Sequence, residues 1–307
     1  MSADLREPSL YIATGKKGVG KTYATENYIL KSYVMSDRKK GIKGRPVVIF
    51  DTNNEFTDVP AFQWDIEQYK PKSGNAKPVI DRVKVGKLLK QWCVDVYHGR
   101  KQAKIVRIMP FLKNGKPMNT NQKRETVWVL LECVRGGLLY LEDFNNYFTG
   151  SSNQDVIGQI TTNRHKGQDM ILHMQTLNKL DPNLFANCSF VRMHKQKDPV
   201  KRIKNKLPNE EMFLLAEAII DVQYEKDPRF FLYLDLDRDK IMFYNLSAKD
   251  IKTKFSEGCI YYLTKHKQYF KEIAEIHTHK NLNSLNQREK SEIHKKFIQE
   301  KMTYIKR

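Results

Sequence analysis

Short apolar runs alternate with longer amphipathic stretches over the first two thirds of the chain. Six runs have the length of strands: Leu10–Thr14, Val47–Asp51, Ile105–Pro110, Leu138–Leu141, Met170–Met174 and Ser189–Met193. Several are apolar without interruption, which is typical of strands covered on both faces. Helical patterns lie between them at Lys21 to about Ser36, Val83–Tyr97, Gln122–Val134 and Asn153–Asn163. This alternation predicts an α/β fold with a mainly parallel sheet covered by helices.

The connecting segments are less regular. Residues 52–82 are rich in Pro, Asn, Asp and Lys, so they are predicted to form a long loop or insertion. Residues 113–122 predict a turn followed by a helix start, with Thr120 or Asn121 as the capping residue.

The pattern changes after Met193. Residues 194–211 are basic and contain prolines, which indicates an exposed loop or linker. A helical stripe follows in "NEEMFLLAEAIIDVQYEK", then two strands joined by a turn near Asp237–Asp239, then charged helices to the end. We therefore expect a domain at 1–200 and a smaller, basic α+β appendage at 201–307.

The charge of the chain points to a polyanionic partner. Lys and Arg number 54 against 35 Asp and Glu, so the formal net charge is +19. A charge of this size attracts nucleic acid, although a lysine-rich proteome would also produce it. Residues 194–206 are the most concentrated basic stretch, and residues 260–271 mix basic with aromatic side chains. Both are candidates for contact with DNA, with solvated surface as the alternative.

The cysteines and the apolar runs bear on the compartment. Four isolated cysteines, without a CxxC pair, are predicted to be reduced and packed. No apolar stretch approaches the roughly 18 residues that a membrane span requires. We expect a cytoplasmic protein without a membrane span.

The loop directly after the first apolar run reads "GKKGVGKT" at residues 15–22. Its spacing is that of a phosphate-binding loop, with a predicted strand before it and a predicted helix after it. Glycines let successive backbone N–H groups turn toward phosphate oxygens, and the helix start adds the positive end of its dipole. The lysine reaches the β- and γ-phosphates, and the threonine hydroxyl binds Mg²⁺. We predict nucleotide contacts from Gly15, Lys16, Lys17, Gly18, Val19, Gly20, Lys21, Thr22 and Tyr23.

Two acidic residues follow the apolar run Leu138–Leu141. Carboxylates at the carboxyl edge of a parallel sheet can bind the metal of a nucleotide and activate the attacking water. We assign Glu142 to Mg²⁺ together with Thr22, and Asp143 to the water. Gln175 follows a later apolar run at the same predicted edge, where its amide would hold the water and sense the γ-phosphate.

The order of these motifs resembles the FtsK/HerA branch of P-loop ATPases, which includes viral genome-packaging motors, conjugation pumps and Zot-like proteins. The resemblance covers about residues 9–193 and rests on "GKKGVGKT", "VVIFDTNNEF", "LLYLED" and "TTNRHKGQDMILHMQT". It implies a ring-shaped homo-oligomer that hydrolyses ATP with Mg²⁺ and moves DNA largely independently of sequence. It also implies an arginine supplied in trans, for which Arg164 is preferred over Arg192, and Glu55 as a further site residue.

The same resemblance bears on the expected partner and location of the protein, and one alternative function stays open. A virion or portal-type protein is a further expected partner, and a viral protein of this kind would act in the host cytoplasm or the virion. Lys16 stands where ParA/MinD proteins carry a signature lysine, but Lys17 replaces their glycine. A nucleotide-dependent dimeric switch of that kind, or a nucleotide-locked structural or DNA-binding protein with low turnover, is the alternative. Glu142 and Asp143 invert the usual Asp-Glu order, which predicts slow hydrolysis. The lack of an NKxD-like motif favours ATP over GTP.

Overall fold

The computed structural model describes residues 8–36, 43–62, 68–69, 79–80, 82–112, 115–148, 158–160 and 167–305. The chain divides into two compact units. The first unit comprises Met1–Ile12 and Thr22–Met174, and the second comprises Ala13–Lys21 and Gln175–Arg307. The domain boundary expected near residue 200 stays a prediction.

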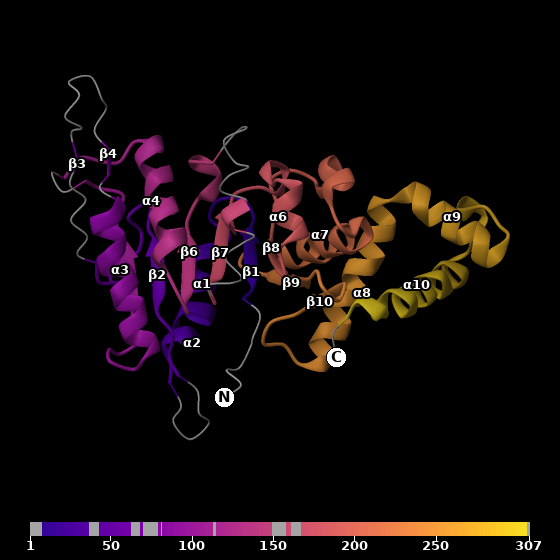
Figure 1. The fold of residues 1–307 in the computed structure, drawn as a ribbon. Helices are drawn as coiled ribbons and strands as arrows, with labels where there is room; N and C mark the ends of the chain where they lie inside the picture. The colour runs from indigo at the N-terminus through magenta and orange to yellow at the C-terminus, as the bar shows by residue number, and fades with distance from the viewer. Residues whose placement is uncertain are drawn as a thin grey trace. The chain divides into compact units, whose positions relative to one another are not determined.

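The strands form one mainly parallel sheet, as the sequence predicts. Among the described residues, eight strands are hydrogen-bonded in the order β10-β9-β8-β1-β7-β6-β2-β5 (Figure 1). Within the first unit, β2 pairs in parallel with β5 and β6, and β6 pairs in parallel with β7. Within the second unit, β9 pairs antiparallel with β8 and β10. The fold is therefore α/β with an antiparallel edge.

The elements from β1 to β7 follow the predicted runs closely. They are β1 (Leu10–Thr14), α1 (Lys21–Thr25), a π-helical turn η1 (Glu26–Leu30), α2 (Lys31–Val34), β2 (Val47–Phe50), β3 (Gln68–Tyr69), β4 (Val79–Ile80), α3 (Arg82–Tyr97), β5 (Ile105–Ile108), α4 (Thr120–Cys133), β6 (Leu138–Leu141), η2 (Phe144–Asn146) and β7 (Asp169–Met174). The short antiparallel pair of β3 and β4 lies within the predicted insertion. Of the predicted helix Asn153–Asn163, residues 158–160 are described and are helical.

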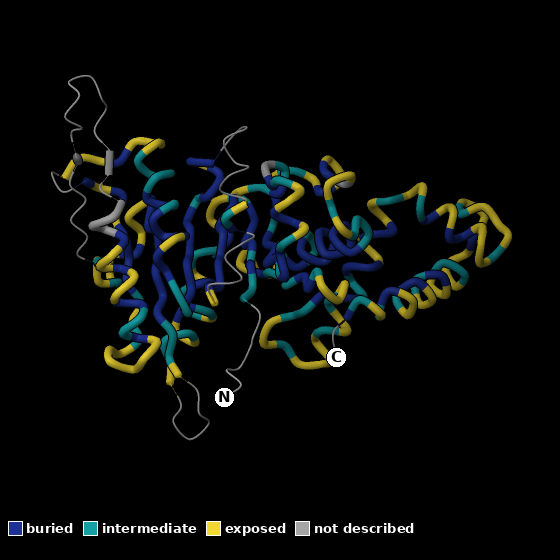
Figure 2. Tube along the Cα trace, viewed as in Figure 1, coloured by how far each residue is buried: buried dark blue, intermediate teal, exposed yellow. Residues whose placement is uncertain are grey.

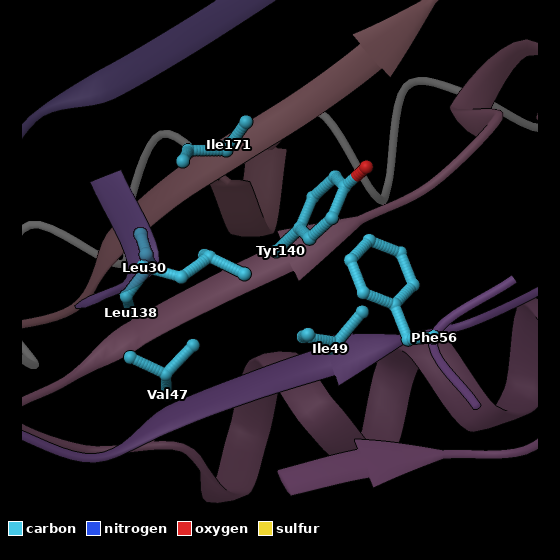
Figure 3. Close-up of a cluster of buried hydrophobic side chains, with 7 residues drawn as sticks. All are labelled: Leu30, Val47, Ile49, Phe56, Leu138, Tyr140 and Ile171. Atoms are coloured by element: carbon cyan, nitrogen blue, oxygen red, sulfur yellow. The ribbon is translucent and has the colours of Figure 1, made fainter. Parts of the chain in front are cut away.

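The core of the first unit explains the uninterrupted apolar runs. Leu30 packs with Val47, Ile49, Phe56, Leu138, Tyr140 and Ile171 (Figure 3). Alternate residues of the same strands, Val48 and Leu139 among them, point to the other face and are equally buried. Figure 2 shows these strands as buried along their length. The strands are therefore covered on both faces, as parallel sheets require.

One predicted cap is wrong by one or two residues. The N-cap of α4 is Asn119, whose Oδ1 accepts a hydrogen bond from the backbone N–H of Gln122 at 3.0 Å. The Gln122 side chain accepts from the Asn119 N–H in return, at 2.9 Å. This reciprocal capping box needs a glutamine three residues after the cap, and neither Thr120 nor Asn121 has one.

The second unit contains η4 (Leu177–Lys179), α6 (Pro182–Ala186), β8 (Phe190–His194), η5 (Val200–Lys206), α7 (Glu210–Tyr224), β9 (Phe231–Asp235), β10 (Lys240–Met242), α8 (Ala248–Lys265), α9 (Lys267–Thr278), η6 (Leu282–Ser284), α10 (Gln287–Lys301) and η7 (Met302–Tyr304). The predicted helix, strand pair and terminal helices are confirmed. The segment 194–211 is not simply an exposed loop, because Val200 and Ile203 of η5 are buried. Their spacing of three residues places both on one side of the 3₁₀ turn.

The terminal helices of the second unit are joined by buried polar contacts. The carboxylate of Glu211 on α7 accepts hydrogen bonds from the Tyr269 hydroxyl at 3.1 Å and the Tyr304 hydroxyl at 3.0 Å. Lys301, which is nearly buried, pairs with Glu211 at 2.7 Å. These contacts fix the last helix on α7, so the charged C-terminal segment is folded and not a solvated tail.

Candidate nucleotide-binding site

The loop between β1 and α1 adopts the backbone conformations that the glycines were predicted to supply. Gly18 and Gly20 have φ values of +82° and +81°, which other residues rarely adopt. A Cβ atom on Gly15 would lie 2.7 Å from the Cβ of His194, so no side chain fits there. The glycines are therefore required by the loop conformation itself.

Lys21 folds back over the loop. Its Nζ donates to the carbonyl oxygen of Gly15 at 2.7 Å and to that of Lys16 at 2.9 Å. The ammonium group is thus held against the first two residues of the loop. The side chain is positioned before any ligand arrives.

The end of β8 supports the loop from the adjacent position in the sheet. The Lys16 N–H donates to the Lys195 carbonyl at 2.9 Å, and the Thr14 hydroxyl donates to Gln196 Oε1 at 3.3 Å. Arg192, which is 2% exposed, donates through Nη2 to the Lys21 carbonyl at 2.8 Å. The loop is therefore fixed at its start and at its end by one strand. A buried guanidinium that acts within its own chain does not suit the trans role considered for Arg192.

His194 completes this support as a neutral side chain. Its Nδ1 lies 3.1 Å from the carbonyl oxygen of Val19, which can only accept a hydrogen bond, so Nδ1 carries the proton. Burial, followed by the charges of Arg192 and Lys21, lowers the pKa of His194 well below its usual value. A neutral imidazole avoids a third positive charge beneath the loop.

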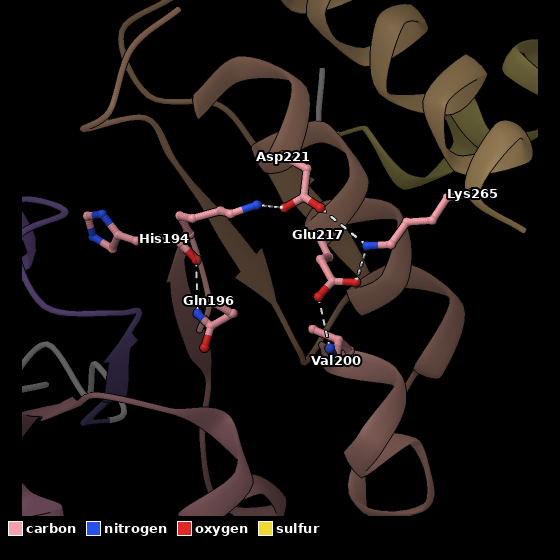
Figure 4. A network of polar contacts seen from close by, with 7 residues as sticks. His194, Gln196, Val200, Glu217, Asp221 and Lys265 are labelled. Carbon is pink, nitrogen blue, oxygen red and sulfur yellow. Dashed lines mark hydrogen bonds and ion pairs between the residues drawn. The ribbon is translucent and has the colours of Figure 1, made fainter. Parts of the chain in front are cut away.

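Ion pairs lie beside the carboxyl end of β8 in the second unit. Lys195 donates to Asp221 at 2.7 Å, and Lys265 bridges Asp221 and Glu217 (Figure 4). The other oxygen of Glu217 accepts from the Val200 N–H at 2.8 Å. Every carboxylate of this network has a cationic or N–H partner, so the network is structural.

Two cations at the loop rest on one aromatic ring. The Nζ of Lys16 lies 4.3 Å from the ring centroid of Tyr224, and the Nζ of Lys195 lies 5.8 Å from it. Both distances are in the range of cation–π attraction. The Tyr224 ring therefore attracts both ammonium groups, and it carries no negative charge that would neutralise them.

The predicted acidic pair lies in the first unit, directly after β6. Glu142 is 2% exposed, and its backbone carbonyl accepts hydrogen bonds from the hydroxyls of Tyr147 at 2.8 Å and Thr52 at 3.3 Å. Its side-chain Oε2 has no hydrogen-bond partner in the described part of the chain. A buried carboxylate oxygen without a partner is uncommon and calls for a ligand or a proton.

The surroundings of Glu142 favour the proton. Burial, and then the charges of Glu55, Asp51 and Asp143, raise the pKa of Glu142 to about 9. Asp51 is itself paired with Arg107 at 2.9 Å, whereas the one contact that lowers the pKa of Glu142 is a backbone hydrogen bond from Asn53. The cluster therefore favours the protonated, neutral form of Glu142 at neutral pH.

Asp143 differs from Glu142 in exposure and conformation. It is half-buried and has a left-handed φ of 45° at the N-cap of η2. Its Oδ2 accepts from the amide groups of Asn53 at 3.0 Å and Asn146 at 3.3 Å. Left-handed backbone is tolerated better by Asp and Asn than by most residues. The chain thus turns sharply between the two carboxylates.

This donor set fits Mg²⁺. Mg²⁺ prefers oxygen ligands and usually takes one or two carboxylates, with phosphate oxygens and waters completing the shell. Glu142 offers one unpartnered oxygen within an acidic cluster. Among the described residues, no group of three or more His, Cys, Asp or Glu side chains is arranged to hold a metal by itself. One such oxygen is within the number of carboxylate ligands that Mg²⁺ usually takes from a protein.

A buried polar chain connects three elements of the first unit, and the sequence pattern did not reveal it. His173 on β7 is 1% exposed. Its Nε2 lies 2.7 Å from the hydroxyl of Thr25 on α1, and its Nδ1 lies 2.7 Å from the hydroxyl of Tyr140 on β6. A polar residue inside an apolar run is the signal that could have identified it. The chain joins the helix after the loop to the strand before Glu142.

The remaining predicted residues lie as follows. Thr22 follows Lys21 in α1 and is half-buried, whereas Tyr23 is exposed and meets the ring of Tyr28 edge-on. Gln175 is exposed directly after β7. Arg164 lies outside the described residues.

Two further sequence predictions have clear outcomes. The four cysteines, Cys93, Cys133, Cys188 and Cys259, are buried and form no disulfide. Burial raises the pKa of the Cys93 thiol to about 11, so it is inert at neutral pH. Among the helices that the structure describes, none has the length and apolar character needed to cross a bilayer.

Comparisons with known proteins return structures and no sequence relatives. No family model and no curated protein matches the sequence. The genome-packaging NTPase B204 of Sulfolobus turreted icosahedral virus 2, in complex with ATP-γS, aligns at a TM-score of 0.47 and 14% identity, over 76% of this chain and 95% of B204. B204 of Sulfolobus turreted icosahedral virus, described as a DNA-packaging ATPase, gives 0.47 and 14% over 77% and 97%.

A second kind of neighbour is the N-terminal domain of zonular occludens toxin from Neisseria meningitidis. It aligns at a TM-score of 0.30 and 15% identity, over 61% of this chain and 76% of that domain. The chain is similar in structure to a viral packaging NTPase and to a zonular occludens toxin domain, while its α/β fold is established by its own elements.

Proposed function

We propose that this protein binds ATP at residues 15–22 and hydrolyses it to translocate or package DNA as a homo-oligomeric ring. The observation that carries the proposal is the loop itself. Its glycines have the required backbone conformations, and Lys21 Nζ lies 2.7 Å and 2.9 Å from two loop carbonyls. A cationic, preformed loop of this kind is a binding site for phosphate groups.

The roles of the side chains follow from their chemistry. Backbone N–H groups of the loop and Lys21 bind the β- and γ-phosphates. Thr22 and Glu142 are the residues that would hold Mg²⁺, which neutralises phosphate charge when bound. Asp143 orients the attacking water, and Gln175 senses the γ-phosphate. An arginine from a neighbouring subunit, with Arg164 as the candidate, would stabilise transition-state charge.

The proposed DNA contact rests on charge. The net charge of +19 favours a polyanion, and Lys197, Lys201, Arg202 and Lys206 are exposed in and near η5. Lysine and arginine contacts to phosphates do not read base sequence, as a translocating protein requires. The packaging role named for the B204 proteins is compatible with this proposal.

Phosphate release with and without DNA tests the function. We expect Mg-ATP hydrolysis that DNA stimulates severalfold, with the stimulation falling as salt rises. Lys21→Ala should abolish nucleotide binding, and Lys249→Ala, an exposed change in the first turn of α8, should not. Absence of ATP binding to the unaltered protein by calorimetry would sink the proposal.

The ParA/MinD-like dimeric switch is the alternative. In that group two subunits sandwich the nucleotide, whereas here the Nζ of Lys16 lies 4.3 Å from the ring centroid of Tyr224 in its own chain. Particle size with and without nucleotide separates the two. A ring supports the motor, and a nucleotide-dependent dimer supports the switch.

A further inference from the structure

The turn between α7 and β9 lies at the same sheet edge as the phosphate-binding loop. Strand β9 is antiparallel to β8, and Phe231 at its start pairs with His194 at the end of β8. Residues 225–230 therefore precede β9 at the carboxyl end of β8. That is the end from which His194 and Lys195 support the loop.

Arg229 of this turn packs directly against the loop. A Cβ atom on Gly20 would lie 3.2 Å from the Cγ of Arg229, and 3.5 Å from both its Cβ and its Cδ. The aliphatic stem of the arginine therefore lies against the loop at Gly20. The guanidinium is bonded to Cδ, so a rotation of the side chain is enough to bring it to a phosphate held by the loop.

The turn is held in one conformation. The Asp227 N–H donates to the Gln223 carbonyl at 2.8 Å, and Asp227 Oδ1 accepts from the Arg229 N–H at 2.9 Å. The Phe230 N–H donates to the Asp227 carbonyl at 3.0 Å, and Phe230 is buried. Arg229 is exposed above this anchored turn. The stem is positioned by backbone contacts before any ligand binds.

We propose that Arg229 is a nucleotide-binding residue that contacts the phosphates from within the same chain. The inference rests on the proposed function. It adds a guanidinium contact to the phosphates, which no residue of the "GKKGVGKT" motif supplies. Arginine presents a planar, permanently charged set of N–H donors that suits phosphate oxygens. The position beside Gly20 assigns it to the phosphates and not to the base.

Binding of ATP and of tripolyphosphate, measured by calorimetry, tests this assignment. Arg229→Met keeps the stem and removes the charge, so it should weaken both ligands about 10-fold, the lower range for hydrogen bonds to charged groups. Arg229→Lys restores the charge but not the planar group, and should recover part of the loss. The loss should shrink as salt rises.

Arg238→Met is the matched control. Arg238 is exposed and follows the other end of β9, where Asp235 pairs with Phe190 at the start of β8. It should leave both affinities unchanged. Both arginines are exposed. Thermal unfolding of each variant checks that the fold is intact.

The outcomes separate the two proposals. Equal affinities of Arg229→Met and the unaltered protein overturn the assignment, and so does a loss confined to ATP with tripolyphosphate unaffected, which would indicate stacking on the base. Neither result touches the proposed function. If the unaltered protein binds neither ligand, the proposed function itself fails.

Discussion

Each compact unit contains a buried glutamate, and the two differ in how they are compensated. Glu217 in the second unit is 5% exposed and accepts from Lys265 at 3.0 Å and from the Val200 N–H at 2.8 Å. Glu142 in the first unit is 2% exposed, and its Oε2 has no partner among the described residues. Similar burial therefore accompanies opposite electrostatic situations.

This difference indicates which of the two buried carboxylates is the candidate functional group. A buried charge with full pairing contributes to the fold, because its removal leaves its partners uncompensated. A buried carboxylate with a raised pKa and an unpartnered oxygen costs stability, which is typical of functional sites. Burial alone would not have distinguished the two.

The largest expected difference is in hydrolysis. Glu142→Gln removes the charge proposed to hold Mg²⁺, so the rate of phosphate release should fall by at least about 10- to 100-fold, the effect seen for outer partners of metal sites. Glu217→Gln should leave the rate per folded molecule unchanged. Steady-state assays at saturating Mg-ATP check both, and equal losses would remove the distinction.

The next effect is on stability. Glu217→Gln keeps the shape but removes the charge facing Lys265, which should lower the free energy of unfolding by about 1–3 kcal/mol. Glu142→Gln should not lower it at neutral pH. Urea unfolding of both variants provides the measurement. Destabilisation by Glu142→Gln alone would contradict the assignment.

Glu142 should also produce a pH dependence of stability. The pKa of Glu142 is raised from 4.5 to about 9, so over this window the folded chain holds a proton that the unfolded chain releases. The contribution of this group to stability is complete below the unfolded pKa and is lost as the pH rises through the folded pKa. The stability of Glu142→Gln relative to the unaltered protein should therefore grow from about pH 5 to about pH 8, by at most about 1.4 kcal/mol per pH unit.

Unfolding without nucleotide or Mg²⁺ tests this pH dependence. Parallel stability curves for the two proteins would show that Glu142 has the same pKa in the folded and unfolded chains.

The smallest effect concerns the buried polar chain of Thr25, His173 and Tyr140 in the first unit. Tyr140→Phe and Thr25→Val each remove one hydroxyl from His173 and should each cost about 0.5–1.5 kcal/mol of unfolding free energy. A double-mutant cycle should show coupling, since both hydroxyls bond to one ring. Strict additivity would mean that the ring does not connect α1 with β6.

The sequence predicted the elements well because both faces of the strands are buried. The run Leu138–Leu141 matches β6, and Leu10–Thr14 matches β1. The run Val47–Asp51 extends one residue beyond β2. Asp51 leaves the strand because its carboxylate accepts from the backbone N–H groups of Glu55 and Phe56, at 2.8 Å and 3.1 Å.

The candidate site was predictable only in its local part. The loop and the acidic pair are short motifs whose spacing is contained in consecutive residues. The supporting residues Arg192, His194 and Arg229 lie far from the loop in the sequence, toward the C-terminus. Their roles depend on which strands are neighbours in the sheet. Apolar patterns predict that strands exist but not which strands are neighbours, so these contacts required the structure.

The assignment of residues 13–21 to the C-terminal unit has a consequence for dissecting this protein. The polypeptide passes from one unit to the other after Ile12, after Lys21 and after Met174. A fragment that stops at Met174 would retain every letter of the "GKKGVGKT" motif and lose the side chains of β8 that brace it. We expect such a fragment to be a poor nucleotide binder, because its recognition sequence would be complete and its scaffold missing.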